Sequence, residues 1–180
     1  MKTSIAANSS DSEASQLDKL LKGCAHSIEQ CDSLLSQICE KSYVHNSATA
    51  SSIGAHMRHV LERYQCFLSG LGDGSVDYDA RKRDQGIESN LDAARFAVAA
   101  VARRIMDFQA VGSDLVQVSE SVHHLSPKVS IDSTVSRELM GLITHTTHHL
   151  AIMGMIARDL GYHLDDDFGK APSTIVFESS

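Results

Sequence analysis

Two histidines separated by one helical turn, His145 and His149, are the residues of this sequence best suited to chemistry. Residues i and i+4 of a helix project from the same side, so both imidazoles can reach one metal ion. A single H-x-x-x-H pair is more often an ordinary pair of surface or hydrogen-bonded histidines. The metal-site interpretation therefore depends on a third histidine from another helix.

A second pair of histidines, His56 and His59, supplies that candidate. On a helical wheel at about 100° per residue, His145 and His149 border the apolar stripe of their helix, whereas His148 points further towards solvent. The wheel prefers His56 as the third ligand, because it lies closer to the apolar stripe of its own helix. Two helices with histidines beside the core favour a metal site over coincidence. No such partners are evident for the other histidines, which are His26, His45, His123, His124 and His163.

Three neutral imidazoles leave coordination positions open on Zn²⁺ or Ni²⁺, which is typical of catalytic rather than structural sites. Water or a thiol in an open position becomes more acidic, which gives a nucleophile near neutral pH without a catalytic Ser or Cys. No general base is evident from the spacing. Glu62, Glu138 and Asp159 are candidates only because they share the two histidine-bearing helices, and we expect each to be a solvated surface residue.

Four segments with helical spacing of apolar residues must position these side chains. The predicted helices cover about residues 13–43, 53–71, 87–112 and 133–161. Ser51 and Ser52 supply N-cap hydroxyls for the second helix, and its run stops in the glycines of LGDGS. The fourth helix begins at a cap near Asp132 or Ser133 and ends at Gly161.

Residues 114–132 break this pattern. Apolar and polar residues alternate there around Pro127, which favours a short irregular hairpin over a helix. The sequence therefore predicts an all-α fold, an antiparallel four-helix bundle with a long crossover connection before the last helix. The expected layout is a disordered tail over 1–12, the bundle over 13–161, and a C-terminal tail over 162–180 that packs near the bundle.

Composition narrows the class of protein. The length of 180 residues fits one domain, and 16 basic against 23 acidic residues lack the clustered charge that nucleic-acid binding needs. The one basic cluster, Arg81-Lys82-Arg83, is either a solvated loop or a small-anion site.

No apolar run has the length of a signal peptide or membrane span, so we expect a cytoplasmic protein without membrane contact. The cysteines form no CxxC pair and are expected to be small core hydrophobes in a reducing compartment: Cys24, Cys31, Cys39 and Cys66.

The sequence resembles the DinB/YfiT-like superfamily over about residues 13–161. The resemblance rests on the order and separation of two motifs, Ser52-Ile53-Gly54-Ala55-His56-Met57-Arg58-His59 and His145-Thr146-Thr147-His148-His149. It implies a four-helix bundle with a three-histidine metal site. In that superfamily the ligand on the second helix lies seven residues after the capping residue, which implies His59, together with His145 and His149. His56 remains the alternative that the wheel prefers.

Two features qualify the resemblance. Leu150 stands where many members carry Arg in an H-H-R-G-Q run, so no substrate-anion contact is expected from that position. The loop 78–84 and the tail segment 167–174 resemble segments of a narrower subset of members, and we expect them to frame the mouth of the pocket.

Characterised members of the superfamily include low-molecular-weight thiol S-transferases and thiol-dependent isomerases, while many members have no known activity. The first hypothesis is a metal-dependent transferase that uses Zn or Ni, a low-molecular-weight thiol and a small-molecule substrate. The alternative is a non-catalytic metal-binding or stress-associated bundle whose ion links two helices. A purely helical interaction module would require the histidines to be coincidental. Homodimerisation is common in the superfamily, so a homodimer is expected, on a surface that the sequence does not specify.

Overall fold

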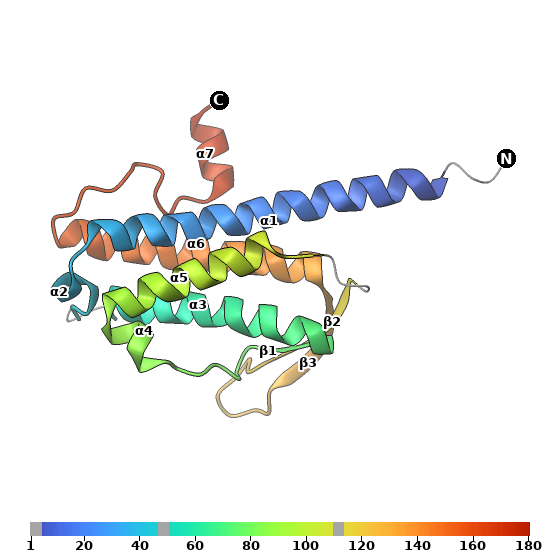
Figure 1. Cartoon of the computed structure of the whole chain (residues 1–180), viewed down its shortest axis with the longest axis horizontal. Coiled ribbons are helices and arrows are strands. Elements are labelled where there is room, and N and C mark those ends of the chain that lie inside the picture. The colour runs from blue at the N-terminus through green and yellow to red at the C-terminus, as the bar shows by residue number, and fades with distance from the viewer. Residues whose placement is uncertain (1–4, 47–50, 110–113) are drawn as a thin grey trace.

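The fold is known from a computed structural model, which describes residues 5–46, 51–109 and 114–180. Its longest elements are the helices α1 (Ile5–Gln37), α3 (Ile53–Gly70), α5 (Leu91–Met106) and α6 (Val135–Asp159). Helix α1 packs against α5 and α6, and α3 packs against the same two helices (Figure 1). The shorter elements are α2 (Glu40–Tyr43), the 3-10 turn η1 (Leu71–Asp73), α4 (Gln85–Ser89) and α7 (Pro172–Glu178).

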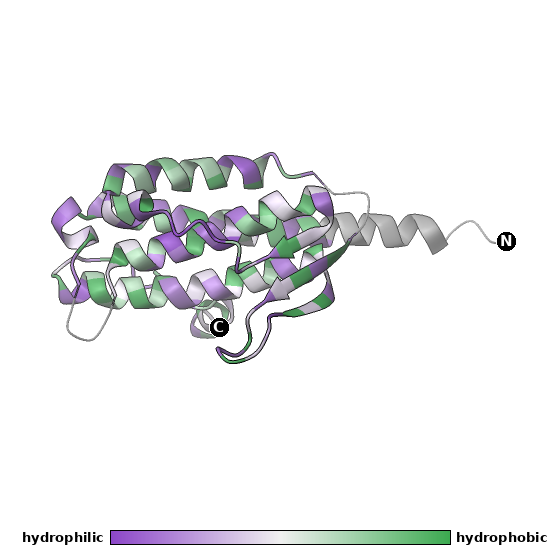
Figure 2. Ribbon diagram, turned by 90° about the horizontal axis from the view of Figure 1, so that it is seen from below, coloured by the Kyte–Doolittle hydropathy of each residue, from purple (hydrophilic) through white to green (hydrophobic). Residues whose placement is uncertain are grey.

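The long helices share one hydrophobic core. Hydrophobic and hydrophilic residues alternate in short runs along them, as the colouring in Figure 2 shows. Each helix turns its apolar positions inward, because burial of a large aliphatic side chain contributes about 1.5–3 kcal/mol. Fully buried side chains come from all four long helices, for example Leu34, Leu35, Leu61, Phe67, Ala94, Leu139 and Met153.

A three-stranded sheet lies at one end of the long helices, and α2 and α4 lie at the other end (Figure 1). The strands are β1 (Ser75–Asp77), β2 (Leu115–Glu120) and β3 (Val129–Thr134), in the order β1-β2-β3. Strand β1 pairs in parallel with β2, with Val76 opposite Val118, and β2 pairs antiparallel with β3. Val76, Val116 and Val118 are buried, so one face of the sheet joins the hydrophobic core.

The prediction of an all-α, antiparallel four-helix bundle is wrong, because the described residues combine seven helices with a mixed three-stranded sheet. The hairpin expected between residues 114 and 132 is present as β2 and β3. The long connection before α6 is therefore a pair of strands and not only a loop. The backbone N–H and C=O groups of β2 and β3 form hydrogen bonds between the two strands. The unpredicted strand β1 completes the sheet by pairing in parallel with β2.

The helix limits differ from the predicted ones at several ends. Helix α1 begins at Ile5, within the predicted tail, whose first four residues lie outside the described residues. Ser52 caps α3 as predicted, since its side chain accepts a hydrogen bond from Ala55 N. The cap of α6 is Thr134 rather than Asp132 or Ser133. Helix α5 ends at Met106, and the predicted end near Gly112 lies outside the described residues.

The C-terminal tail, residues 162–180, packs against α1 and α6. The ring of Phe168 is buried beside Gly154 of α6, and the Gly169 N–H donates to Gln30 Oε1 of α1 at 2.8 Å. Gly169 has a φ of +74° and approaches the backbone of Ala151 closely enough that a side chain would not fit. Although no helical period is evident in its sequence, the tail ends in the short helix α7. Among the described residues, no helix has the length and apolar character needed to span a bilayer.

The cysteines fall into two groups. Cys24 and Cys31 are buried as predicted, and burial raises the pKa of each thiol to about 12. Cys66 is half-buried. Cys39 is exposed instead of lying in the core, and hydrogen bonds to the Ser42 and Tyr162 hydroxyls lower its pKa to about 7.

Candidate metal centre

Helices α3 and α6 lie in contact and carry the histidines of both sequence motifs. On α3, the buried residues Met57 and Val60 face the core, which leaves His56 and His59 half-buried at the edge of that face. On α6, Thr146 and Leu150 are buried, and the residue preceding each of them is a half-buried histidine. The helical repeat therefore places two histidines from each helix along one line of contact.

Three of these histidines converge. One ring nitrogen from each of His59, His145 and His149 lies within 4.8 Å of the other two. The ring centroid of His59 lies 4.8 Å from the centroid of His145 and 4.8 Å from that of His149. The centroids of His145 and His149 are 4.6 Å apart. Nitrogens bound to one tetrahedral zinc ion at about 2.0–2.1 Å lie about 3.3 Å from one another. Modest rotations of the rings would therefore bring the three nitrogens to one ion.

His145 supplies a nitrogen with no other use. Its Nε2 atom is buried and has no hydrogen-bond partner in the described part of the chain. A buried polar atom without a partner costs about 1–3 kcal/mol, so such an atom in a native site needs an ordered water or a bound ion as its partner. Coordination of a cation would satisfy it.

His149 is oriented by His56, whose Nδ1 atom lies 3.0 Å from the Nδ1 atom of His149. A neutral imidazole donates through one nitrogen and accepts through the other. When His149 donates from Nδ1 to His56, its Nε2 carries a lone pair and can bind a metal. His56, which the wheel preferred as a ligand, thus contacts a candidate ligand and lies outside the converging set, whereas His59 lies inside it.

The environment keeps the three converging rings neutral. Burial is the largest cause and lowers the pKa of His59 and His149 to about 4 and that of His145 to about 3. The neighbouring Arg81 adds to the shift at His59, and Arg63 adds to the shift at His145. Neutral imidazole is the form that binds metal, so protonation does not block these three rings at neutral pH.

A polar network from the sheet borders the cluster. Arg63 of α3 forms an ion pair with Glu120 of β2, and its guanidinium lies 4.0 Å from the centre of the Tyr78 ring. The Tyr78 hydroxyl donates to Glu138 Oε2 at 2.8 Å, and Ser133 donates to the other oxygen of Glu138 at 2.7 Å. Glu120 and Ser133 of the sheet thereby hold Arg63 of α3 and Glu138 of α6 in place.

The three candidate bases predicted from the sequence occupy different environments. Glu62 is 2 % exposed and accepts a hydrogen bond from Asp84 N at 2.8 Å, so the prediction of a solvated residue is wrong for it. Glu138 is half-buried and bound to Tyr78 and Ser133. Only Asp159, at the end of α6, is exposed as predicted.

Other predicted features are also placed by the structure. The loop 78–84 reaches the cluster through Arg81, whose guanidinium donates to His59 Nδ1. Leu150 is buried in the core, so no polar contact arises from it. The histidines without predicted partners are all exposed, namely His26, His45, His123, His124 and His163.

Helical spacing could have indicated Arg63, which follows His59 by one turn of α3, whereas no local pattern pointed to Glu120, the ion-pair partner of Arg63 on β2. Arg81 was visible only as part of a basic cluster in a loop. Tertiary contacts bring Glu120 to Arg63 and Arg81 to His59.

Comparison with protein-family models, with curated proteins and with solved structures finds no match for this chain. The resemblance to the DinB/YfiT-like superfamily therefore stays a prediction from two sequence motifs, and the candidate site is defined by its geometry.

Proposed function

We propose that this protein binds one divalent metal ion through His59, His145 and His149. We further propose that the metal-loaded protein is a thiol S-transferase. The observation that carries the proposal is the convergence of three neutral ring nitrogens within 4.8 Å. Two further features support it, namely the unpartnered Nε2 of His145 and the contact by which His56 orients His149. Imidazole donors suit Zn²⁺ and Ni²⁺.

A divalent ion in a three-imidazole site supplies Lewis acidity, which lowers the pKa of a thiol that reaches an open coordination position. In the proposed reaction the S–H bond of a low-molecular-weight thiol breaks and its proton passes to solvent. An S–C bond then forms to an electrophilic carbon of a second small molecule, and the leaving group departs with its bonding electron pair. The residues of the chain hold the donors in place and shield one side of them from water.

The first experiment measures metal content. We expect protein purified without an affinity tag to retain about one zinc or nickel ion per chain, as measured by elemental analysis. The His149→Ala variant should lose at least about 100-fold in zinc affinity, more than the 10–100-fold cost of changes beyond the ligand set. The matched control is His124→Ala, which removes an exposed histidine from the connection between β2 and β3 and should bind zinc as the wild type does.

The second experiment measures turnover. Metal-loaded protein is assayed with cysteine or glutathione as the thiol and chlorodinitrobenzene as the electrophile. Conjugation that is lost in His149→Ala and after treatment with a chelator supports the transferase. Stoichiometric metal without conjugation of any thiol would instead support the alternative, an ion that links α3 to α6 and stabilises the fold. Absence of metal binding by the wild-type protein would overturn both.

A further inference from the structure

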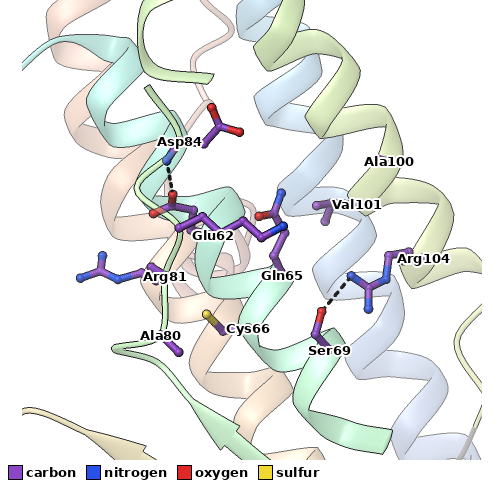
Figure 3. Close-up of a pocket in the computed structure, with 11 residues that line it drawn as sticks. Glu62, Gln65, Cys66, Ser69, Ala80, Arg81, Asp84, Ala100, Val101 and Arg104 are labelled. Carbon is purple, nitrogen blue, oxygen red and sulfur yellow. Dashed lines mark hydrogen bonds between the residues drawn. The ribbon is translucent and has the colours of Figure 1, made fainter. Parts of the chain in front are cut away.

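A cleft of about 350 Å³ lies beside the histidine cluster, between α3, the loop 80–84 and α5 (Figure 3). Helix α3 contributes Glu62 and Cys66 to its lining, the loop contributes Arg81 and Lys82, and α5 contributes Arg104. Glu62 and Cys66 follow His59 on the same face of α3, by three and seven residues. The cleft is therefore continuous with the face that carries one candidate ligand.

The lining of this cleft carries three cations against two carboxylates. Arg81, Lys82 and Arg104 form no ion pair in the described residues, and the hydrogen bond from Arg104 to the Ser69 hydroxyl is long, at 3.5 Å. Both carboxylates of the lining are already engaged with backbone. Glu62 accepts from Asp84 N, and the Asp84 side chain accepts from Gly86 N at the start of α4. Three cations without a carboxylate partner in the described residues suit a small organic anion.

Arg81 lines the cleft but donates its hydrogen bond elsewhere, to His59 Nδ1. Figure 3 shows its guanidinium directed away from Arg104 and Gln65. Its Nε atom is buried without a hydrogen-bond partner in the described residues, so its present position leaves one donor unused.

The hydrogen bond from Arg81 excludes a metal ion from His59. A guanidinium only donates, so Nδ1 of His59 must be the acceptor. A neutral imidazole has one nitrogen lone pair available, and while Nδ1 accepts from Arg81 the proton resides on Nε2. Neither nitrogen can then coordinate a cation. If the imidazole binds metal through either nitrogen, Arg81 has to leave.

We propose that Arg81 is shared between His59 and the cleft, and that the cleft binds a small dicarboxylate or similar organic anion when Arg81 is released into it. This inference rests on the proposed metal site, because it makes the metal and the anion partners in one equilibrium. Metal at His59 frees Arg81 for the anion, and the anion withdraws Arg81 from His59. By thermodynamic linkage each ligand raises the affinity of the other by the same factor.

The test uses succinate as the probe, titrated by calorimetry with and without saturating Zn²⁺. We expect zinc to increase the succinate affinity of the wild type by about 5-fold or more. In Arg81→Met this enhancement should disappear. Lys82→Met makes the same change of charge at the next position and should weaken succinate binding while keeping the enhancement by zinc. An enhancement that persists in Arg81→Met would mean that succinate contacts the metal directly, and would overturn the proposal.

A third variant separates this inference from the proposed function. His59→Ala removes the acceptor that holds Arg81, so succinate should bind more tightly to the metal-free variant than to the metal-free wild type. An unchanged affinity would show that Arg81 is not held back by His59. If zinc fails to bind the wild type while His59→Ala shows tighter succinate binding, the metal site is wrong and the anion cleft stands, although its coupling to metal is refuted.

Discussion

His56 and His149 meet through their Nδ1 atoms, 3.0 Å apart, at the contact between α3 and α6. Because one of the two nitrogens must donate and the other must accept, this bond couples the tautomer of His149 to that of His56. The tautomer that donates to His56 leaves the lone pair on Nε2. His56 is therefore a positioning residue for a candidate ligand, and the choice between His56 and His59 becomes a division of roles.

We predict that His56→Ala lowers zinc affinity by about 10–100-fold, the range for loss of a hydrogen-bond partner behind a metal ligand. His56→Gln should recover most of the affinity, since its amide oxygen can accept from His149 Nδ1. Competition with a chromophoric chelator measures the affinity. A loss in His56→Ala as severe as that in His149→Ala would show that His56 is itself a ligand, and no loss at all would remove its positioning role.

Lowering the pH should destabilise the metal-free protein. The pKa of His59 and His149 in the folded state is about 4 and that of His145 is about 3, whereas histidine in an unfolded chain has a pKa of about 6.5. Between these values the unfolded state binds more protons than the folded state, so the free energy of unfolding falls as the pH falls from about 6.5 towards 4. The slope is smaller than about 1.4 kcal/mol per pH unit for each histidine, because water reaches the half-buried rings and screens them.

Urea unfolding in the presence of a chelator, repeated from about pH 7 to about pH 4, checks this prediction. The His149→Gln variant has one histidine fewer in the cluster and should show a shallower loss of stability, whereas His124→Ala should follow the wild type. Equal slopes for the wild type and His149→Gln would contradict the assignment of the pH dependence to the cluster.

The helical spacing of His145 and His149 could be read from the sequence because both residues share one helix, whose repeat fixes their relative direction. The helical repeat did not decide between His56 and His59, because that choice depends on how α3 is rotated against α6, whereas the family resemblance pointed to His59. The wheel selected the residue nearer the apolar stripe, and that residue instead contacts another histidine. Proximity to the core and proximity to the second helix are different properties, and only tertiary packing defines the second.

The sheet shows the same limit of prediction from local sequence patterns. Alternation around Pro127 was sufficient to predict the hairpin of β2 and β3. Strand β1 has three residues, too few to show a period, and its parallel partner lies about 40 residues further along the chain. Its formation depends on contacts with α3 and β2. The predicted all-α class failed at this point, where local pattern carries no information about a distant strand.

The start of α3 should be sensitive to one methyl group. A Cβ atom at Gly54 would lie 2.0 Å from the Glu88 carbonyl oxygen and 3.0 Å from the Tyr43 ring, which is closer than packing permits. We predict that Gly54→Ala lowers the free energy of unfolding by about 1–3 kcal/mol through overpacking. Because α3 carries His56 and His59, zinc affinity should fall as well. Thermal and chemical unfolding measure the stability.

Gly141→Ala is the matched control, made in the interior of α6. The nearest atom to a Cβ at that position is the flexible end of the Arg137 side chain, at 3.5 Å. Alanine there should stabilise the protein by up to about 1 kcal/mol, since it has a higher helix propensity than glycine. Stabilisation by both substitutions would contradict the close approach of α3 to α4.

Glu62 holds the loop that carries Arg81. Its carboxylate is 2 % exposed and accepts from the backbone N–H of Asp84 at 2.8 Å, and Arg83, in the same loop, has a φ of +50°. A non-glycine residue in the left-handed region is held there by its surroundings, so the loop should relax when this anchor is removed. We predict that Glu62→Ala lowers the free energy of unfolding by about 1.5–3 kcal/mol, the usual contribution of a hydrogen bond to a charged group.

The matched variant Glu62→Gln keeps an oxygen that can accept from Asp84 N and should retain most of the stability. Hydrogen exchange at the Asp84 amide provides a local readout, which should accelerate in Glu62→Ala and stay near the wild-type rate in Glu62→Gln. The released loop should also let Arg81 leave His59 more readily. Glu62→Ala should therefore lose stability without losing zinc affinity. An Asp84 amide that exchanges equally slowly in all three proteins would show that other contacts anchor the loop.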